Sequence, residues 1–327
     1  MKKTIQIWFT DFYKGFDPYN NNLTDFLQPE FPLEITPENP DFLIYSCHGK
    51  EFLNFNCARI FYTGENLLPD FNLCDYAIGF HHLQFDDRYL RFPNYAFIRD
   101  QFEKLVSPKT FISEDLHQKN IFCNFIYANA QAHPARDDFF QVLNKYKKVS
   151  SPGKHLNNIN FDIGERFAED WMYTKLAFQS SCKFSIAFEN TSTPGYLTEK
   201  IMHAFITNTI PIYWGDTHVI KDFNPDAFIN CHNFNNFSEV VEFVKQVDQD
   251  EKLYLEILNA PAFPSNKIPK HLKMENLIGF FSNIFEQDLE KRIRRPLYGT
   301  TKKYEEELRQ NHNEAGVFQK IKSKLKF

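Results

Sequence analysis

The chain has 327 residues, enough for about two domains, and 43% of them are hydrophobic, including 37 Phe, 15 Tyr and 3 Trp. Its formal net charge of −5 is unevenly distributed, since residues 291–327 carry eleven Lys/Arg and four Glu, a balance of +7. The rest of the chain is therefore acidic, which argues against nucleic acid as the main partner.

The six cysteines are dispersed, and no C-x-x-C pair or zinc-like spacing occurs. Buried free thiols are therefore favoured over disulfides, which fits a reducing compartment. The apolar run at residues 5–9 is too short for a signal peptide, and no run approaches the ~20 residues that span a bilayer. A cytoplasmic protein is predicted. The cysteines are Cys47, Cys57, Cys74, Cys123, Cys182 and Cys231.

Short apolar runs separated by polar breaks predict a first α/β domain. The predicted strands are residues 5–9, 42–46, 59–62 and 76–80, with short helices at 21–27 and 94–105. Residues 106–119 show no sustained periodicity and contain Ser107-Pro108, so we place the domain boundary there.

The second half alternates strand and helix patterns, which predicts a second α/β domain with a parallel sheet and a cleft between the two domains. Its predicted strands are residues 121–127, 184–188, 210–214 and 228–231. Its predicted helices are 135–146, 167–180, one from Thr198, 238–247 and 251–258, with a loop at 150–160 and a connector at 259–269. A last long helix is predicted at 277–294.

The stretch 183–216 is the most informative, because it forms a strand–loop–helix–strand unit. Ligands bind at such junctions in open α/β sheets, and a helix N-terminus suits an anion. We expect the Thr198 hydroxyl to cap the helix. Lys200 in the first turn opposes the helix dipole unless an anion compensates it; the alternative is a surface Glu199–Lys200 pair. No glycine-rich phosphate loop occurs, so side chains must grip any phosphate.

Two further residues are candidates for chemistry. Arg136 lies between a strand end and a helix start and offers a planar fork for phosphate oxygens; the alternative is a solvated helix charge. Glu65 follows an apolar strand and Gly64, where a partly desolvated carboxylate can act as a general base; the alternative is a turn residue.

No histidine or cysteine spacing indicates a metal site, and the D-x-D at residues 248–250 is interpreted as solvated surface. In the basic tail, apolar side chains recur on one helical face between Val317 and Leu325, with lysines on the rest. This pattern predicts a short amphipathic helix for an anionic membrane surface; a disordered basic tail is the alternative. Residues 296–316 are predicted to be a flexible tether or loose helix.

The central stretch resembles the signature of glycosyltransferase family 10, the α1,3-fucosyltransferases, with the bacterial enzymes of Lewis-type antigens the most similar. The signature runs through Phe188-Glu189-Asn190, Gly195-Tyr196-Leu197-Thr198-Glu199-Lys200-Ile201 and Thr209-Ile210-Pro211-Ile212-Tyr213-Trp214-Gly215. Residues 61–66, 75–80, 87–91 and 221–225 extend it. Two departures are a turn at 191–195 with fewer glycines and the absence of heptad repeats before the tail.

The resemblance implies a GT-B fold, with two Rossmann-like domains facing a central cleft and a basic C-terminal tail. Residues 1–116 would bind the acceptor, 117–275 would bind GDP-fucose, 276–295 would form a closing helix, and 296–327 a membrane-associating tail. The protein would associate peripherally with the inner membrane from the cytoplasm. The implied reaction is inverting transfer of L-fucose to the 3-OH of GlcNAc in N-acetyllactosamine-type glycans of lipopolysaccharide.

The family's residue roles map onto this chain one by one. The resemblance implies that Glu65 is the general base and that Arg136 and Lys200 stabilise the charge of the leaving diphosphate. It also implies that Glu199 stabilises the oxocarbenium-like sugar. Further donor-pocket positions fall on Asn129, Asn190, Tyr196, Leu197 and Thr198, with Gly64 beside the base. No metal is implied as obligatory, and stimulation by Mn²⁺ or Mg²⁺ stays open. The alternatives are another nucleotide sugar on the same fold, or a non-catalytic glycan-binding protein.

Overall fold

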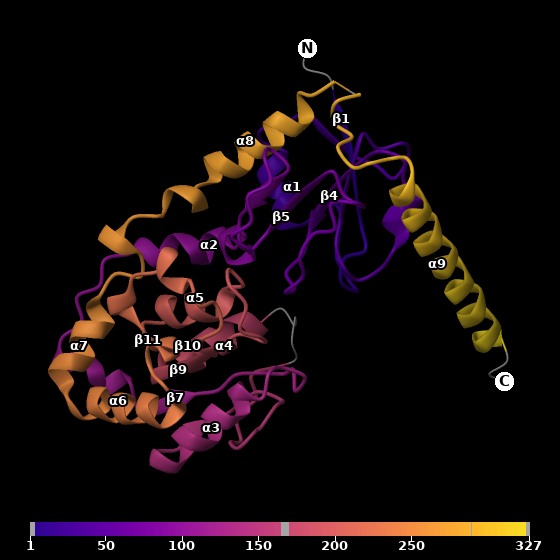
Figure 1. Cartoon of the computed structure of the whole chain (residues 1–327). Helices are drawn as coiled ribbons and strands as arrows, with labels where there is room; N and C mark the ends of the chain where they lie inside the picture. Colours follow the sequence, from indigo (N-terminus) through magenta and orange to yellow (C-terminus); the bar gives the residue numbers. More distant parts are fainter. Residues whose placement is uncertain (1–3, 165–169, 289, 325–327) are drawn as a thin grey trace. The chain divides into compact units, whose positions relative to one another are not determined.

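The computed structural model describes residues 4–164, 170–288 and 290–324, with residues 313–324 described by their backbone alone. The chain forms two compact units: unit 1 comprises Met1–Phe92 and Lys273–Phe327, and unit 2 comprises Pro93–Leu272. Each contains a parallel sheet, as predicted (Figure 1). The division differs from the predicted boundary after residue 116, because the segment at 94–106 packs on helix α5 (Glu199–Ile206) of unit 2.

Unit 1 has a six-stranded sheet in the order β2-β1-β3-β4-β5-β6, with every pair parallel. Its strands are β1 (Ile5–Thr10), β2 (Leu33–Ile35), β3 (Phe42–Tyr45), β4 (Ala58–Tyr62), β5 (Tyr76–Gly79) and β6 (Tyr89–Arg91), with helix α1 (Asn22–Leu27). The four predicted strands are confirmed. The sequence missed β2 and β6, since three residues are too few to show a pattern. All carboxyl ends of the strands share one edge of the sheet.

Unit 2 has a five-stranded parallel sheet in the order β11-β10-β9-β7-β8. Its strands are β7 (Ile121–Asn124), β8 (Val149–Ser150), β9 (Cys182–Phe188), β10 (Ile210–Trp214) and β11 (Ile229–Asn230). Its helices are α2 (Arg99–Phe102), α3 (Ala135–Tyr146), α4 (Trp171–Ser180), α5 (Glu199–Ile206), α6 (Phe237–Gln249) and α7 (Glu251–Asn259). Residues 165–169 of the predicted helix 167–180 lie outside the described residues.

Alternation along β9 explains how helices cover both faces of this sheet. Phe184, Ile186 and Phe188 point into a core completed by side chains of α3, α6 and α7. The intervening residues face α4 and α5, which pack on the opposite side (Figure 1). The predicted single helix at 94–105 is wrong: Ile98 (ψ 72°) separates a 3-10 turn (Asn94–Phe97) from α2.

The interpretation of the D-x-D motif as solvated surface is also wrong for its first residue. The Asp248 side chain is 4% exposed and pairs with Lys183 and, at 3.0 Å, with Lys147. It also accepts a hydrogen bond from the Tyr146 hydroxyl at 3.0 Å. Asp248 therefore ties α3 and β9 to the end of α6.

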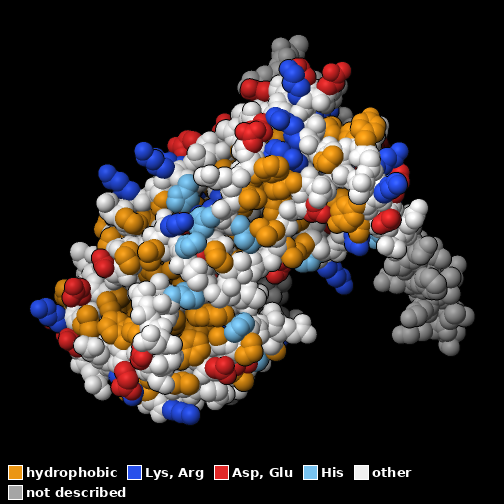
Figure 2. Space-filling model, viewed as in Figure 1, with side chains coloured by type: hydrophobic (Ala, Val, Ile, Leu, Met, Phe, Trp, Pro, Cys, Tyr) orange, Lys and Arg blue, Asp and Glu red, His pale blue; other side chains and the backbone are white. Residues whose placement is uncertain are grey.

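On the face drawn in Figure 2, acidic and basic side chains of the described residues are interspersed.

The long helix predicted at 277–294 ends earlier, because α8 spans Met274–Phe285. Phe285 packs on Phe42 with ring centroids 4.9 Å apart, which holds α8 on the unit 1 sheet. Three arginines beyond it bond to carboxylates of unit 1 instead of continuing the helix. The pairs are Arg292–Asp41 at 3.0 Å, Arg294–Asp87 at 2.6 Å, and Arg295–Asp75.

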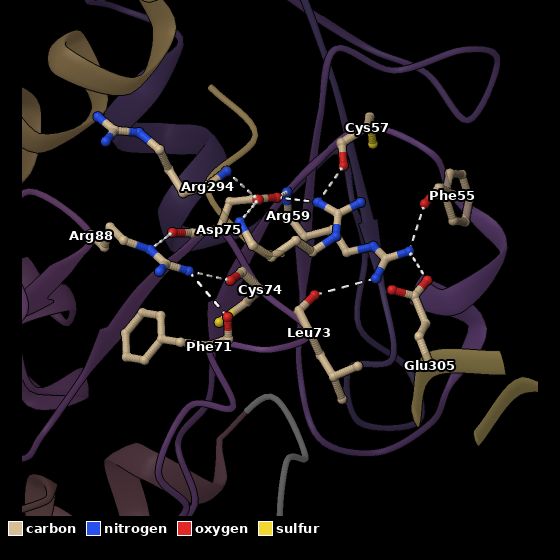
Figure 3. Close-up of polar contacts among 11 residues, drawn as sticks. Phe55, Cys57, Arg59, Phe71, Leu73, Cys74, Asp75, Arg88, Arg294 and Glu305 are labelled. Carbon is tan, nitrogen blue, oxygen red and sulfur yellow. Dashed lines mark hydrogen bonds and ion pairs between the residues drawn. The ribbon is translucent and has the colours of Figure 1, made fainter. Parts of the chain in front are cut away.

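The Asp75 carboxylate is the centre of a buried charge cluster (Figure 3). Asp75 is fully buried and accepts hydrogen bonds from the backbone N–H groups of Arg59 (2.7 Å), Arg294 (2.7 Å) and Arg295 (2.9 Å). The Arg295 guanidinium, 2% exposed, supplies the countercharge. Because Asp75 precedes β5, this cluster lies at the amino-terminal edge of the sheet and fixes the C-terminal segment there.

Helix α9 (Thr300–Lys324) starts inside the segment predicted as a tether or loose helix. Its first turns are anchored to unit 1: Glu305 accepts from Arg59 at 2.8 Å, and the Tyr304 hydroxyl donates to Asp70 at 3.0 Å. The tether prediction is therefore wrong for these turns. The tail is helical to Lys324, but the predicted apolar face from Val317 to Leu325 lies outside the described side chains.

No helix of the described residues is long and apolar enough to cross a membrane. All six cysteines are free, as favoured.

We predict that Arg295→Met strongly destabilises the protein, because it leaves the Asp75 carboxylate buried without its countercharge. The expected loss is about 3–5 kcal/mol of unfolding free energy, measured by urea denaturation. The matched control is Lys291→Met, which breaks the exposed pair with Asp288 (74% and 79% exposed) and should leave the midpoint nearly unchanged. Equal midpoints for the two variants would contradict the role given to Arg295.

Candidate active site

A buried ion pair joins the end of β9 to the first turn of α5. Glu189, which directly follows β9, is fully buried, and its Oε2 accepts from Lys200 Nζ at 2.9 Å. The Lys200 side chain is 18% exposed. The surface Glu199–Lys200 pair left open by the sequence is therefore wrong, since the partner of Lys200 is the buried Glu189.

The electrostatics of this pair keep Lys200 protonated. Burial alone would lower the pKa of Lys200, but Glu189 and Glu199 outweigh it and raise that pKa above its usual value. An ammonium has three N–H donors, and Glu189 and the Thr198 hydroxyl (2.9 Å) account for two. Among the described residues the third N–H has no acceptor.

Thr198 contributes differently from the prediction. It is the residue before α5, but its hydroxyl makes no cap bond to the helix. Instead Thr198 Oγ1 lies 2.7 Å from Glu189 Oε2, and Thr198 N donates to Glu189 Oε1 at 2.8 Å. The capping prediction is wrong because the buried carboxylate takes these groups as its own partners.

The loop before α5 is held by the end of β10. Asp216, fully buried, accepts from Gly195 N at 2.6 Å, and Ser192 Oγ donates to Gly215 O at 2.7 Å. A Cβ at Gly215 would lie 2.5 Å from Glu189 Cγ, so only glycine allows this approach. Tyr196 and Leu197, both predicted donor-pocket positions, are buried within the loop.

Arg136 lies at the start of α3 and is 1% exposed, so the solvated-charge alternative is wrong. Its guanidinium stacks 4.2 Å from the Tyr127 ring centroid and donates to Asn190 Oδ1 (3.4 Å) and to Asn129 O. The structure thus brings three predicted donor-site residues together. Arg136 Nε is buried and has no partner among the described residues.

Tyr127 is influenced by both cations. Burial raises the pKa of its phenol, and the charges of Arg136 and Lys200 oppose that rise. The Tyr127 hydroxyl accepts from Phe188 N at 2.7 Å and lies 2.8 Å from Ile186 O. The buried Arg136 and the partly buried Lys200 therefore follow β7 and β9, near the carboxyl ends of those strands.

A cavity of about 510 Å³ borders this site. Tyr127 forms one wall, and Gly153 approaches its backbone so closely that a Cβ would collide with Tyr127 O. The size lies within the range of small-molecule sites. Other lining residues are Lys154, Asn157, Asp162 and Trp171.

The sequence missed two groups that neighbour Glu199. Lys175, on α4, is 8% exposed and donates to His203 Nδ1 at 3.0 Å, while His203 Nε2 contacts Gln101 Oε1 at 2.9 Å. Burial alone would raise the pKa of Glu199, but Lys200 and Lys175 outweigh it and lower the pKa to about 2. The signal in the sequence was Lys175, a charged residue inside an apolar helix pattern.

Glu65 and Gly64 belong to unit 1 and follow β4. Both are exposed, and Glu65 N donates to the hydroxyl of the buried Thr63 at 3.1 Å. The backbone of Glu65 is therefore held at the carboxyl edge of the sheet, while its carboxylate is open to solvent.

We predict that His203 makes stability depend on pH. Burial and then Lys175 lower the pKa of His203 well below 6.5, so the unfolded chain binds the proton first as pH falls. The free energy of unfolding should fall below about pH 6.5, by at most about 1.4 kcal/mol per pH unit. His203→Gln should flatten this profile in urea titrations between pH 7 and 5. Identical slopes in both proteins would contradict the prediction.

Two family models match this chain: the α-(1,3)-fucosyltransferase FucT N-terminal domain at residues 7–98, and glycosyltransferase family 10 (fucosyltransferase) C-term at residues 116–260. The chain is 34% identical over 269 residues to the α-(1,3)-fucosyltransferase FucT of Helicobacter pylori, covering 71% of this chain and 54% of that protein. It is 36% identical over 148 residues to the putative fucosyltransferase R654 of Acanthamoeba polyphaga mimivirus, covering 44% and 24%. The chain thus spans about half or less of these relatives.

Solved structures agree with these matches. An α1,3-fucosyltransferase crystallised with GDP-fucose is 30% identical with a TM-score of 0.72, covering 87% of this chain and 91% of that one. The structure with GDP gives the same identity and coverage with a TM-score of 0.73. These likenesses confirm the predicted GT-B class of α/β fold.

Proposed function

The chain belongs to glycosyltransferase family 10, and we propose that it is an α1,3-fucosyltransferase. It transfers L-fucose from GDP-fucose to the 3-OH of GlcNAc in N-acetyllactosamine-type glycans. The observation that carries this proposal is the pair of cations, the buried Arg136 and the partly buried Lys200, near a cavity large enough for a nucleoside.

In this proposal unit 2 binds the donor. Arg136, with its unpartnered Nε, and Lys200, with its third donor, hold the diphosphate. The guanosine enters the cavity, where Tyr127 and Trp171 offer apolar surface. Asp162 at the rim carries carboxylate oxygens that match the N1–H and amino donors of guanine. The proposed donor pocket also includes Asn129, Asn190 and the loop from Tyr196 to Thr198.

The proposed reaction is one in-line displacement. Glu65 takes the proton of the acceptor hydroxyl, whose oxygen forms a bond to C1 of fucose while the bond from C1 to the diphosphate oxygen breaks. The β-linked donor then becomes an α-fucoside, and the charge on GDP is neutralised by Arg136 and Lys200. Glu199, ionised by its neighbours, opposes the positive charge that develops on the sugar.

Because two fixed cations already face the diphosphate, we propose no obligatory metal; assays with EDTA, Mn²⁺ and Mg²⁺ measure any stimulation. We further propose that the basic tail binds anionic lipid on the cytoplasmic side of the inner membrane, near lipopolysaccharide precursors. The charge of residues 291–327 and the helical backbone of α9 support this.

The donor prediction is tested by thermal protection. GDP and GDP-fucose should raise the melting temperature, whereas UDP-GlcNAc should not, and GDP-mannose should protect less than GDP-fucose. Arg136→Met should lose most of the GDP protection, because the unpartnered Nε is removed. Lys147→Met, on the same unit but paired with Asp248, is the control that should keep it. Stronger protection by UDP-GlcNAc would favour another nucleotide sugar.

Lys200 needs a paired design, since Lys200→Met alone leaves Glu189 buried and unpaired. The double variant Lys200→Met/Glu189→Gln removes both charges. Under the proposal this double variant folds, and it binds GDP more weakly than the parent chain does.

The base assignment predicts that Glu65→Gln slows transfer by about 10²- to 10⁴-fold while protection by GDP-fucose is unchanged. Glu34→Gln, an exposed change in the same unit, is the control with full activity. Full activity of Glu65→Gln would exclude Glu65 as the base. Absence of transfer by the parent chain with intact GDP binding would favour a non-catalytic glycan-binding protein.

A further inference from the structure

The loop after β1 gathers aromatic side chains at the carboxyl edge of the unit 1 sheet. Phe12 and Phe16 stack with centroids 4.0 Å apart and an interplanar angle of 15°, and Tyr13 meets Phe16 edge-on at 5.8 Å. Tyr62, the last residue of β4, lies 6.3 Å from Phe12. We call these four residues the aromatic platform. Phe9 at 5.7 Å from Phe16 is buried beneath it.

The platform is partly exposed to solvent, most of all at Tyr13. Tyr13 is 53% exposed, and Phe12, Phe16 and Tyr62 are half-buried. Rings that only completed a core would be covered, as Phe9 is. Exposed aromatic rings with a polar tip are typical of binding surfaces.

The loop that carries the platform is held at an energetic cost. Asp11 adopts φ 61°, a left-handed conformation that costs a non-glycine residue about 1–3 kcal/mol. Its carboxylate accepts from Glu51 N (2.9 Å) and Phe52 N (2.8 Å), and its carbonyl accepts from His48 N (2.8 Å). Gly49 is required, because a Cβ there would collide with Asp11 Oδ1. These contacts therefore fix the conformation of the loop at Asp11.

The platform and the proposed base share the carboxyl edge of the unit 1 sheet. Tyr62 ends β4 and is followed by Thr63, Gly64 and Glu65, and the Thr63 hydroxyl accepts from Glu65 N. A ligand that stacks on the platform would therefore bind at the edge that carries the proposed base.

We propose that the aromatic platform is the acceptor subsite and binds the β-galactosyl ring of N-acetyllactosamine. One face of galactose exposes the C–H groups at C3, C4 and C5, an apolar patch that fits an aromatic face. Galactose is linked next to the 3-OH of GlcNAc, so seating it on the platform brings that hydroxyl toward Glu65. The proposal rests on the proposed fucosyltransferase function.

The test compares two acceptors, N-acetyllactosamine and the methyl glycoside of GlcNAc, which lacks galactose. Tyr13→Ala and Phe16→Leu should each raise KM for N-acetyllactosamine about three- to ten-fold, the worth of one aromatic contact. The KM for GDP-fucose, the melting temperature and kcat/KM for methyl GlcNAc should not change. Tyr13→Phe should restore the parent KM, because it keeps the ring.

Tyr298→Ala is the matched control, an 83% exposed tyrosine of unit 1 that follows Arg295. It should leave both acceptors unaffected. If the parent chain transfers fucose but the platform variants do not change KM, or weaken both acceptors equally, the platform proposal is overturned while the function stands. If the parent chain transfers no fucose to either acceptor, the proposed function itself is overturned.

Discussion

The junction between β9 and α5 depends on one buried carboxylate. Glu189 directly follows β9 inside the protein, where an unpaired charge would cost several kcal/mol, so it must bond to Lys200 and Thr198. Those bonds fix the first turn of α5 against the sheet, and Gly215 leaves room for the carboxylate. The ion pair keeps Lys200 charged and in place without a ligand. We interpret this as preorganisation: in the proposed function, the cation that would meet the diphosphate is already oriented by Glu189.

Unit 1 separates stability from chemistry at opposite edges of one sheet. Asp75 precedes β5 at the amino edge, where it pairs with Arg295 of the C-terminal segment, and the Arg59 guanidinium pairs with Glu305 of α9 (Figure 3). At the carboxyl edge lie Glu65 and the aromatic platform. This is the edge at which parallel sheets present ligand sites, because the loops there are free to differ while the strands hold them. Buried charge pairs stabilise the amino edge, whereas partly exposed aromatic rings and the Glu65 carboxylate lie at the carboxyl edge.

The sequence predicted most strands and helices because their apolar patterns are local. Ala135–Tyr146 and Ile210–Trp214 have the predicted bounds. It failed where partners are distant: α8 ends at Phe285 because Arg295 bonds to Asp75, 220 residues away, and α9 is held by Glu305 on Arg59, 246 residues away. Arg136 and Lys200 were candidates from their place at loop–helix junctions. Their buried setting, with Tyr127 and Glu189, was invisible because chain spacing does not report which side chains meet across a sheet.

We propose that this chain transfers fucose to one defined hydroxyl with inversion. The most direct measurement is NMR analysis of the product formed from GDP-fucose and N-acetyllactosamine. We predict an α-linked fucose on O3 of GlcNAc, with one GDP released for each product molecule. A β-linked fucose, attachment at another oxygen, or release of GDP without transfer would contradict the account.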